Sequence, residues 1–277
     1  MSKILVFGTS GQVATELRRL APVQALGRDT VDLANPSACA EAIRFHRPTA
    51  VINAAAYTAV DRAEAEEALA TAINGVAPAA MAEACAALRI PLVHISTDYV
   101  FAGGGTRPFA PNDATAPQNA YGRSKLTGEQ GIRATGASHA ILRTSWVFSA
   151  HGANFVKTML RLSETHNELS LVDDEVGGPT SARAIASACL ELARKRQVDP
   201  RKSGTYHFTG APDFSWCDFA RAIFAAAGRA TRDYPTPASR PQNSRLDCST
   251  METRFNITRP DWRTGLSDTL TELGFST

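Results

Sequence analysis

The chain opens on a short apolar strand that runs straight into a glycine turn and a helix, and strands then keep alternating with helices. Apolar runs typical of buried strands occur at 3–7, about 23–26, 50–53, 92–96 and 139–145. Strands that alternate with helices form a parallel sheet covered on both faces. Right-handed crossovers wind such a sheet in both directions and place ligands at the carboxyl ends of its strands. The sequence therefore predicts an α/β fold with a doubly wound parallel sheet of the Rossmann type.

The second half of the chain has a looser alternation, which indicates a second, smaller unit. With 277 residues, 44% of them hydrophobic, the chain can bury one large core and a smaller one beside it. We expect a main domain and a smaller C-terminal lobe that closes over the edge of the sheet. The predicted division assigns 1–149 to the main domain, to which 171–210 returns, and 150–170 and 211–277 to the lobe.

Two helices can be placed from local signals. Asn35 followed by Pro36 combines a capping side chain with a proline at the first helical position, which predicts a helix from there to about residue 46. The alanine-rich stretch 64–88 is predicted to be helical throughout, although it contains Pro78.

Composition excludes several classes of partner. The 29 basic and 27 acidic residues leave a net charge of +2, and no block of like charge marks a nucleic-acid or membrane surface. The chain begins with a strand instead of a signal sequence, and it shows no run of about 18 apolar residues. Its five cysteines lie far apart and are odd in number, which suits reduced thiols. We therefore expect a cytoplasmic protein that acts on a small molecule.

The first turn has the pattern of a dinucleotide site. Gly8-x-x-Gly11-x-x-Ala14 joins strand to helix, so the backbone can turn sharply and approach a pyrophosphate at the helix N-terminus. Arg28 follows the second strand, where an adenosine ribose is expected, and a guanidinium there suits a 2′-phosphate. This favours NADPH. An ordinary solvated arginine is the alternative, and Ala14 replaces a possible third glycine, so NADH stays open.

Further positions along the same rim fit a dinucleotide. Asp32 could accept a hydrogen bond from an adenine amino group, or cap a helix, and Leu33 could cover the ring. The third strand closes on Asn53 and three alanines, 54–56, as a backbone that passes close to a cofactor requires. A tightly packed strand end is the alternative. Thr58 continues into a loop on this rim.

Tyr121 and Lys125 carry the clearest chemical signal. They are four residues apart on a predicted helix and therefore share one face. An ammonium beneath a phenol lowers the cost of ionising it from an ordinary pKa of roughly 10, so the phenol can transfer a proton near neutral pH. Thr97, at the end of the fourth strand, can hold a substrate oxygen. Together these side chains predict the active site of a reductase.

The order of these motifs resembles that of the extended short-chain dehydrogenase/reductases. Within them the chain is similar to the dTDP-4-dehydrorhamnose reductase family, and the similarity extends from the first strand to the C-terminal lobe. The shared motifs are Gly11-Gln12-Val13, the run Asn53 to Asp61, Ser96-Thr97-Asp98-Tyr99, Arg143-Thr144-Ser145-Trp146-Val147, and a Pro-Ala-Ser-Arg-Pro-x-Asn-Ser-Arg-Leu run at 237–246.

The resemblance implies hydride transfer from a nicotinamide to C4 of a dTDP-linked 4-keto-6-deoxy sugar. It implies that Tyr121 donates the proton, that Lys125 binds the nicotinamide ribose and tunes Tyr121, and that Thr97 hydrogen-bonds the keto oxygen. The cofactor residues would be Gly8, Ser10, Gly11, Gln12, Val13, Arg28, Asp32, Leu33, Ala54, Ala55, Ala56, Tyr57, Thr58, Ile95, Tyr121 and Lys125. The substrate residues would be Thr97, Asp98, Tyr121, Trp146, Arg240, Asn243 and Arg245, several of them in the lobe.

Several alternatives stay open. Sister dehydratases resemble Thr-Asp-Glu at this point, but here Asp98 is followed by Tyr99, so elimination lacks its second carboxylate. Reduction or epimerisation of another nucleotide-linked 4-keto sugar would use the same residues, and the family includes a non-catalytic NADP-binding regulatory subunit. Some members bind magnesium at a dimer interface through an acid that matches Glu16. A carboxylate on a helix is usually only solvated, so no metal site is predicted, and a homodimer stays open.

Overall fold

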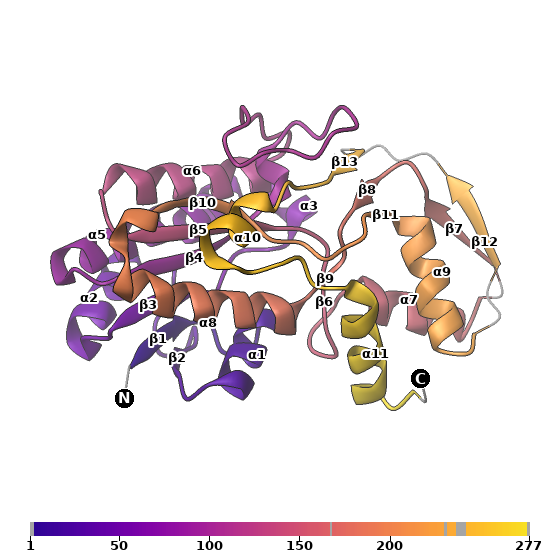
Figure 1. The fold of residues 1–277 in the computed structure, drawn as a ribbon, viewed down its shortest axis with the longest axis horizontal. Coiled ribbons are helices and arrows are strands. Elements are labelled where there is room, and N and C mark those ends of the chain that lie inside the picture. The colour runs from indigo at the N-terminus through magenta and orange to yellow at the C-terminus, as the bar shows by residue number, and fades with distance from the viewer. Residues whose placement is uncertain (1–2, 167, 230–231, 237–241, 276–277) are drawn as a thin grey trace.

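The computed structural model describes residues 3–166, 168–229, 232–236 and 242–275. Its centre is a six-stranded sheet with the strand order β10-β5-β4-β3-β1-β2, in which all neighbours are parallel (Figure 1). The strands are β1 (Ile4–Phe7), β2 (Gln24–Leu26), β3 (Ala50–Asn53), β4 (Leu92–Thr97), β5 (His139–Thr144) and β10 (Gly204–His207). The predicted fold class is confirmed.

Helices cover both faces of this sheet, because its central strands are buried on both sides. One core cluster joins the sheet to α1 and α8, and the other joins it to α2, α5 and α6. The bounds are α1 (Gln12–Leu20), α2 (Pro36–His46), α3 (Val60–Ala63), α4 (Glu67–Thr71), α5 (Ala77–Leu88), α6 (Ala120–Ala134) and α8 (Ala182–Val198). Short 3-10 turns occupy Asp98–Val100 and Pro200–Lys202.

The structure confirms the helix predicted from Asn35 and Pro36, and it confirms most of the helix predicted over 64–88. Helix α2 begins as predicted, with Asn35 Oδ1 accepting a hydrogen bond from a first-turn N–H at 3.2 Å. The predicted helix over 64–88 is confirmed from Glu67 to Leu88, where a π-helical turn at Ala72–Val76 joins α4 to α5, whereas residues 64–66 lie outside it. Pro78 falls at the start of α5, directly after the π-helical turn.

Among the described residues, one helical stretch, Glu67–Leu88, is long and apolar enough to cross a membrane by length and composition alone. Met81, Ala84 and Cys85 of this stretch are fully buried in the cluster that packs on the sheet. Core helices pass the same test, so packing accounts for its apolar composition.

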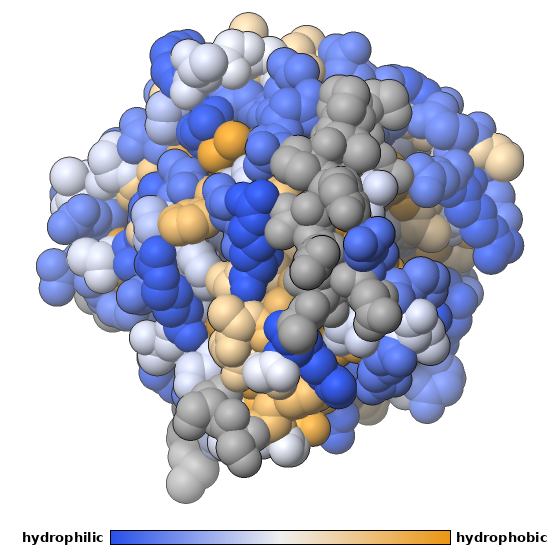
Figure 2. Space-filling view, turned by 90° about the vertical axis from the view of Figure 1, so that its right-hand side faces the viewer, coloured by the Kyte–Doolittle hydropathy of each residue, from blue (hydrophilic) through white to orange (hydrophobic). Residues whose placement is uncertain are grey.

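A smaller lobe lies beside the main sheet, on the right of Figure 1. Its core is an apolar cluster built around Phe219 and Trp262. The view onto this side shows a largely hydrophilic surface with apolar residues gathered in its lower part (Figure 2). The elements of the lobe and its connections are β6 (Val147–Phe148), α7 (Phe155–Ser163), β7 (Glu168–Val172), β8 (Val176–Gly177), β9 (Thr180–Ser181), β11 (Phe214–Ser215), α9 (Trp216–Ala226), β12 (Arg232–Thr236), β13 (Asn243–Ser244) and α11 (Trp262–Glu272).

Two segments lie differently from the predicted division. Helix α10 (Ser249–Phe255) packs beside β10 in the core of the main sheet, although the prediction assigns all of 211–277 to the lobe. Met251 and Phe255 are four residues apart, so they form one apolar face that covers the edge strand. Strand β7 pairs with β12, so residues 171 and 172 do not return to the main sheet.

Candidate functional site

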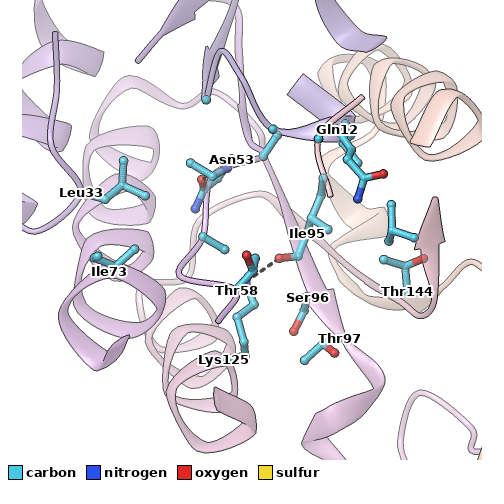
Figure 3. Close-up of a pocket in the computed structure, with 18 of the residues that line it drawn as sticks. Gln12, Leu33, Asn53, Thr58, Ile73, Ile95, Ser96, Thr97, Lys125 and Thr144 are labelled. Atoms are coloured by element: carbon cyan, nitrogen blue, oxygen red, sulfur yellow. Dashed lines mark hydrogen bonds between the residues drawn. The ribbon is translucent and has the colours of Figure 1, made fainter. Parts of the chain in front are cut away.

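A cleft of about 680 Å³ opens at the carboxyl ends of β1, β3 and β4. It lies where the strand order reverses beside β1, the place where doubly wound sheets bind ligands. Figure 3 shows side chains from several of these elements facing one another across it. Most predicted site residues line the cleft: Gly8, Ser10, Gly11, Gln12, Val13, Arg28, Asp32, Leu33, Ala54, Ala55, Ala56, Thr58, Ile95, Thr97, Asp98, Tyr121, Lys125 and Trp146.

The glycine turn brings the end of β1 close to its neighbours. Gly8 has a φ of +116°, which L side chains rarely adopt, and a Cβ there would lie 3.3 Å from that of Ala14 and 3.4 Å from the Ala54 backbone. Gly11 precedes α1 and makes no side-chain cap, so the N–H groups that begin the helix are not occupied by a capping side chain. Such a helix start favours an anion, as a pyrophosphate site requires.

Arg28 lies on the rim of the cleft, just beyond β2. Its side chain is 78% exposed, and its Nε lies 3.9 Å from Asp32 Oδ1. Asp32 Oδ1 also accepts a hydrogen bond from the Ala34 N–H at 3.0 Å, so this carboxylate acts as a local cap as well. The loose pair leaves the guanidinium accessible to an anion at the rim.

Helix α6 carries the two predicted catalytic side chains one turn apart. It begins at Asn119, whose Oδ1 accepts a hydrogen bond from the Gly122 N–H at 2.8 Å. A Cβ at Gly122 would lie 2.3 Å from the Tyr99 carbonyl oxygen, so a glycine is needed for this close approach to the turn after β4. The approach places Tyr121 beside Thr97. The sequence reasoning missed this role of Gly122, whose signal is a glycine inside a helix, where it costs stability.

The surroundings of Tyr121 favour the protonated phenol. Burial is the main cause that raises the pKa of the phenol above its ordinary range, a hydrogen bond with Thr97 opposes the rise, and the Asp98 carboxylate adds to it. Thr97 Oγ1 in turn donates a hydrogen bond to Asp98 Oδ1 at 3.0 Å. The net pKa of Tyr121 is therefore raised, where the sequence predicted a lowered one, because burial outweighs the hydrogen bond with Thr97. Tyr121 is set up to donate a proton.

Lys125 is fully buried beside the cleft. Its Nζ donates a hydrogen bond to the Ile95 carbonyl at 2.7 Å, dashed in Figure 3, and lies 3.2 Å from His94 Nε2. Burial lowers the pKa of Lys125 to about 8, against the attraction of the Glu129 carboxylate. The charge of this side chain therefore changes close to neutral pH.

Asp98 joins the cleft to the lobe. Burial raises the pKa of its carboxyl group to about 6, while hydrogen bonds with Ser244 of β13 and with Thr97 act in the opposite direction. The Asp98 side chain therefore connects Thr97 to the lobe.

Two stacked tryptophans connect the cleft wall to the lobe. Trp146 has a φ of +50°, and its ring stacks on that of Trp216 with 3.7 Å between centroids. Trp216 begins α9, and its Nε1 donates a hydrogen bond to Glu175 Oε2 at 2.8 Å. A Cβ at Gly177 would lie 3.0 Å from the Trp146 ring. The sequence reasoning found Trp146 but missed Trp216 and Glu175, because nothing in their local pattern links them to it.

Several predicted residues do not line the cleft within the described parts of the chain. Asn243 Nδ2 donates a hydrogen bond to the Arg107 carbonyl at 2.8 Å, and its Oδ1 accepts one from the Arg245 guanidinium at 3.1 Å. These bonds stabilise the loop before the catalytic helix. The Tyr57 hydroxyl donates to a glutamate carboxylate at 2.8 Å instead of facing the cleft. Arg240 lies outside the described residues.

Glu16, His151 and Glu272 bring three potential metal-binding atoms within 4.8 Å of one another. Arg19 already occupies this cluster, since its terminal nitrogen lies 2.6 Å from Glu272 Oε1, 3.1 Å from Glu16 Oε1 and 2.9 Å from His151 Nε2. A metal ion would have to displace the guanidinium. In this arrangement the residues do not fit a magnesium site.

The parallel sheet, the glycine turn and the group of Thr97, Tyr121 and Lys125 define an NAD(P)H-dependent oxidoreductase of the extended short-chain dehydrogenase/reductase class. Residues 2–275 match the family described as RmlD substrate binding domain. The chain belongs to this family, that of the dTDP-4-dehydrorhamnose reductases.

Its relatives match along almost their whole length. The dTDP-4-dehydrorhamnose reductase of Sinorhizobium fredii is 43% identical over 279 residues, which cover 94% of each chain. That of Escherichia coli is 40% identical over 291 residues, which cover 98% of this chain and 97% of the relative. The structure of the Bacillus anthracis enzyme in complex with NADP superposes with a TM-score of 0.90 at 31% identity, covering 98% of this chain and 99% of the other. The resemblance inferred from the sequence is confirmed.

Proposed function

We propose that this chain reduces the C4 keto group of dTDP-4-dehydrorhamnose to a hydroxyl, giving dTDP-L-rhamnose, with NADPH as hydride donor and Tyr121 as proton donor. The names of the relatives support the substrate, and the NADP complex of the Bacillus anthracis enzyme supports the cofactor. The observation that carries the proposal is the phenol of Tyr121 beside Thr97, one helical turn from Lys125, in the cleft at the carboxyl edge of the sheet.

The residues of the cleft divide the reaction between them. NADPH, when bound, supplies the hydride, and Gly8, Gly11 and the start of α1 would hold its pyrophosphate. Thr97 orients the keto oxygen of the sugar. As C4 gains the hydride, negative charge develops on that oxygen, and the Tyr121 hydroxyl gives it a proton. The Lys125 ammonium stabilises the phenolate that remains.

The proposal assigns recognition of the nucleotide sugar to the lobe. Trp146, fixed by its stack on Trp216, would cover the sugar. A cytoplasmic location, without nucleic-acid or membrane partners, belongs to the same proposal. It fits the five cysteines Cys39, Cys85, Cys189, Cys217 and Cys248, which are buried thiols. Light scattering on the purified protein would decide between monomer and homodimer.

The direct test is cofactor consumption by the purified protein supplied with dTDP-4-dehydrorhamnose generated in situ. NADPH and NADH are run in parallel, and the product is identified by mass spectrometry and NMR. Turnover to dTDP-L-rhamnose, faster with NADPH, is the expected result. NADPH binding without consumption of either cofactor would overturn the substrate assignment in favour of another keto sugar or a non-catalytic role.

Arg28→Ala is expected to weaken NADPH binding about tenfold and to leave NADH binding unchanged. A charge-assisted hydrogen bond to a 2′-phosphate contributes about 1.5–3 kcal/mol, and NADH has no such phosphate. Fluorescence titration of both cofactors measures the effect. Arg44→Ala, which removes an exposed arginine of α2 away from the cleft, is the matched control. An equal loss for NADPH and NADH would show that Arg28 does not read the 2′-phosphate.

The value of kcat/KM is expected to fall as the pH rises through about 8, where Lys125 loses its proton. The neutral amine no longer stabilises the phenolate left by Tyr121. The pH profile of the wild type is compared with that of Lys125→Met, whose residual activity should lack this alkaline limb. A wild-type profile that stays level through this region would count against the role of the ammonium.

A further inference from the structure

His94 is a buried side chain at the site that the reaction described above does not use. It belongs to β4, is 1% exposed, and stands between Asn53 at the end of β3 and Lys125 on α6. Its Nδ1 lies 3.1 Å from Asn53 Nδ2, and its Nε2 lies 3.2 Å from Lys125 Nζ. A titratable ring in this position can influence the proton on the catalytic amine.

The surrounding hydrogen bonds determine which ring nitrogen carries the proton. The Ala55 N–H donates to Asn53 Oδ1 at 3.2 Å, so the NH₂ group of Asn53 faces His94. That group can only donate, and the ring therefore accepts at Nδ1. Burial lowers the pKa of His94 well below its ordinary value, so the ring is neutral at neutral pH and its single proton sits on Nε2.

The Nε2–H group of His94 then points at Lys125 Nζ. A neutral amine accepts this hydrogen bond with its lone pair, whereas an ammonium offers three N–H donors and no acceptor. The amine form still donates to the Ile95 carbonyl. If the ring proton moved to Nδ1, it would face the NH₂ group of Asn53, and turning that amide round would set its NH₂ group against the Ala55 N–H. When Lys125 is neutral, the hydrogen bonds donated by Ala55, Asn53, His94 and Lys125 can therefore all form at the same time.

Other charged groups around Lys125 act on it differently. They are Glu129, on its own helix, and the cleft-lining Tyr121 and Asp98, from the same helix and from the turn after β4. Glu129 favours the ammonium, but its Oε2 accepts a hydrogen bond from Arg143 at 2.6 Å. His94 differs from these groups because its Nε2–H donor lies within hydrogen-bond distance of Lys125 Nζ.

We propose that His94, held by Asn53, is a positioning residue that favours the neutral form of Lys125 and thereby sets the upper pH limit of catalysis. The inference deepens the proposed function and rests on it for the kinetic test below. The spectroscopic test needs neither substrate nor cofactor.

The spectroscopic test is a nitrogen-15 NMR spectrum of the ring nitrogens in histidine-labelled wild-type protein near neutral pH. The His94 signals are identified by their loss in His94→Gln, or by backbone assignment of the wild type if that variant does not fold. A neutral ring protonated on Nε2 is the expected result. A ring protonated on Nδ1, or a doubly protonated ring, would overturn the proposal.

The kinetic test reverses the hydrogen bonds with Asn53→Asp. A carboxylate accepts where the amide donated, so the ring proton moves to Nδ1 and Nε2 becomes an acceptor for the Lys125 ammonium. The alkaline limb of kcat/KM is then expected to move up by about one pH unit. An unchanged limb, in a variant whose circular dichroism and NADPH binding match the wild type, would overturn the proposal.

A second background separates the ring from a direct effect of the new charge. In His94→Leu, the added Asn53→Asp change is expected to move the limb by less than about half as much, because no ring connects the carboxylate to Lys125. Equal shifts of the alkaline limb in both backgrounds would mean that the new carboxylate acts on Lys125 by its charge alone. That result would overturn the proposal that the His94 ring connects residue 53 to Lys125. A wild type without turnover would count against the proposed function, and the NMR spectrum would still decide the role of His94.

Discussion

Tyr121→Phe is expected to lower kcat by about 10²–10⁴-fold and to leave the affinity for NADPH unchanged. In the proposed reaction, the phenol supplies the proton that neutralises the alkoxide formed at C4. Phenylalanine keeps the ring that meets Tyr99 edge-on, with 5.6 Å between centroids, so packing is preserved while the proton donor is lost. Steady-state NADPH consumption gives kcat, and fluorescence titration gives the dissociation constant of NADPH.

Tyr206→Phe is the matched control for this variant. Tyr206 is buried, and its hydroxyl donates to the Lys202 carbonyl at 2.5 Å, outside the residues that line the cleft. It should keep wild-type turnover. If Tyr121→Phe kept a kcat close to that of the wild type, another group would have to be the proton donor. A regulatory subunit would show no difference between wild type and Tyr121→Phe, because neither would consume NADPH.

Arg143→Met is expected to lower the free energy of unfolding by about 3–5 kcal/mol. Arg143 and Glu129 are 2% and 0% exposed, and two hydrogen bonds of 2.8 and 2.6 Å join the guanidinium to the carboxylate. Removing the cation leaves Glu129 with Ser96, which donates to Oε1 at 2.7 Å, and with the partly exposed Arg133, 3.2 Å from Oε2. Neither replaces the two buried hydrogen bonds from Arg143. Urea unfolding near neutral pH, followed by circular dichroism, measures the change.

Arg123→Met is the control, because it breaks a pair of similar geometry at the surface. Arg123 is 43% exposed and binds Glu67 through hydrogen bonds of 2.7 and 3.0 Å. Its loss should lower the free energy of unfolding by less than about 1 kcal/mol. If Arg143→Met lowered the free energy of unfolding by no more than Arg123→Met, burial would not make the Arg143–Glu129 pair contribute more to stability.

The pH dependence gives a second check on this pair. Burial acts to raise the pKa of Glu129, but the hydrogen bond and charge of Arg143, together with the hydrogen bond from Ser96 and the charge of Arg133, hold that pKa below its ordinary value. A depressed carboxyl pKa stabilises the folded state above the unfolded pKa, and this contribution is lost as the pH falls. The difference in stability between wild type and Arg143→Met should therefore shrink below about pH 4.3.

The cofactor side of the site was predictable because it depends on short stretches of chain. Gly8 and Gly11 are needed wherever a buried strand turns directly into a helix beside a pyrophosphate. The helical period alone places Tyr121 and Lys125 on one face of α6. The substrate-binding side of the site was harder to predict from the sequence. Asn243 and Arg245 have side chains suited to a nucleotide, yet their hydrogen bonds hold the loop at Arg107.

The sequence by itself determined the α/β alternation, the glycine turn, the cap at Asn35 and the spacing of the catalytic pair, because each follows from backbone geometry over a few neighbouring residues. The tertiary structure alone decided that His94 meets Lys125 from 31 positions away and that Trp146 stacks on Trp216. It also decided that burial raises the pKa of Tyr121. Such contacts and the desolvation that accompanies them depend on how distant segments pack together, which no local pattern encodes.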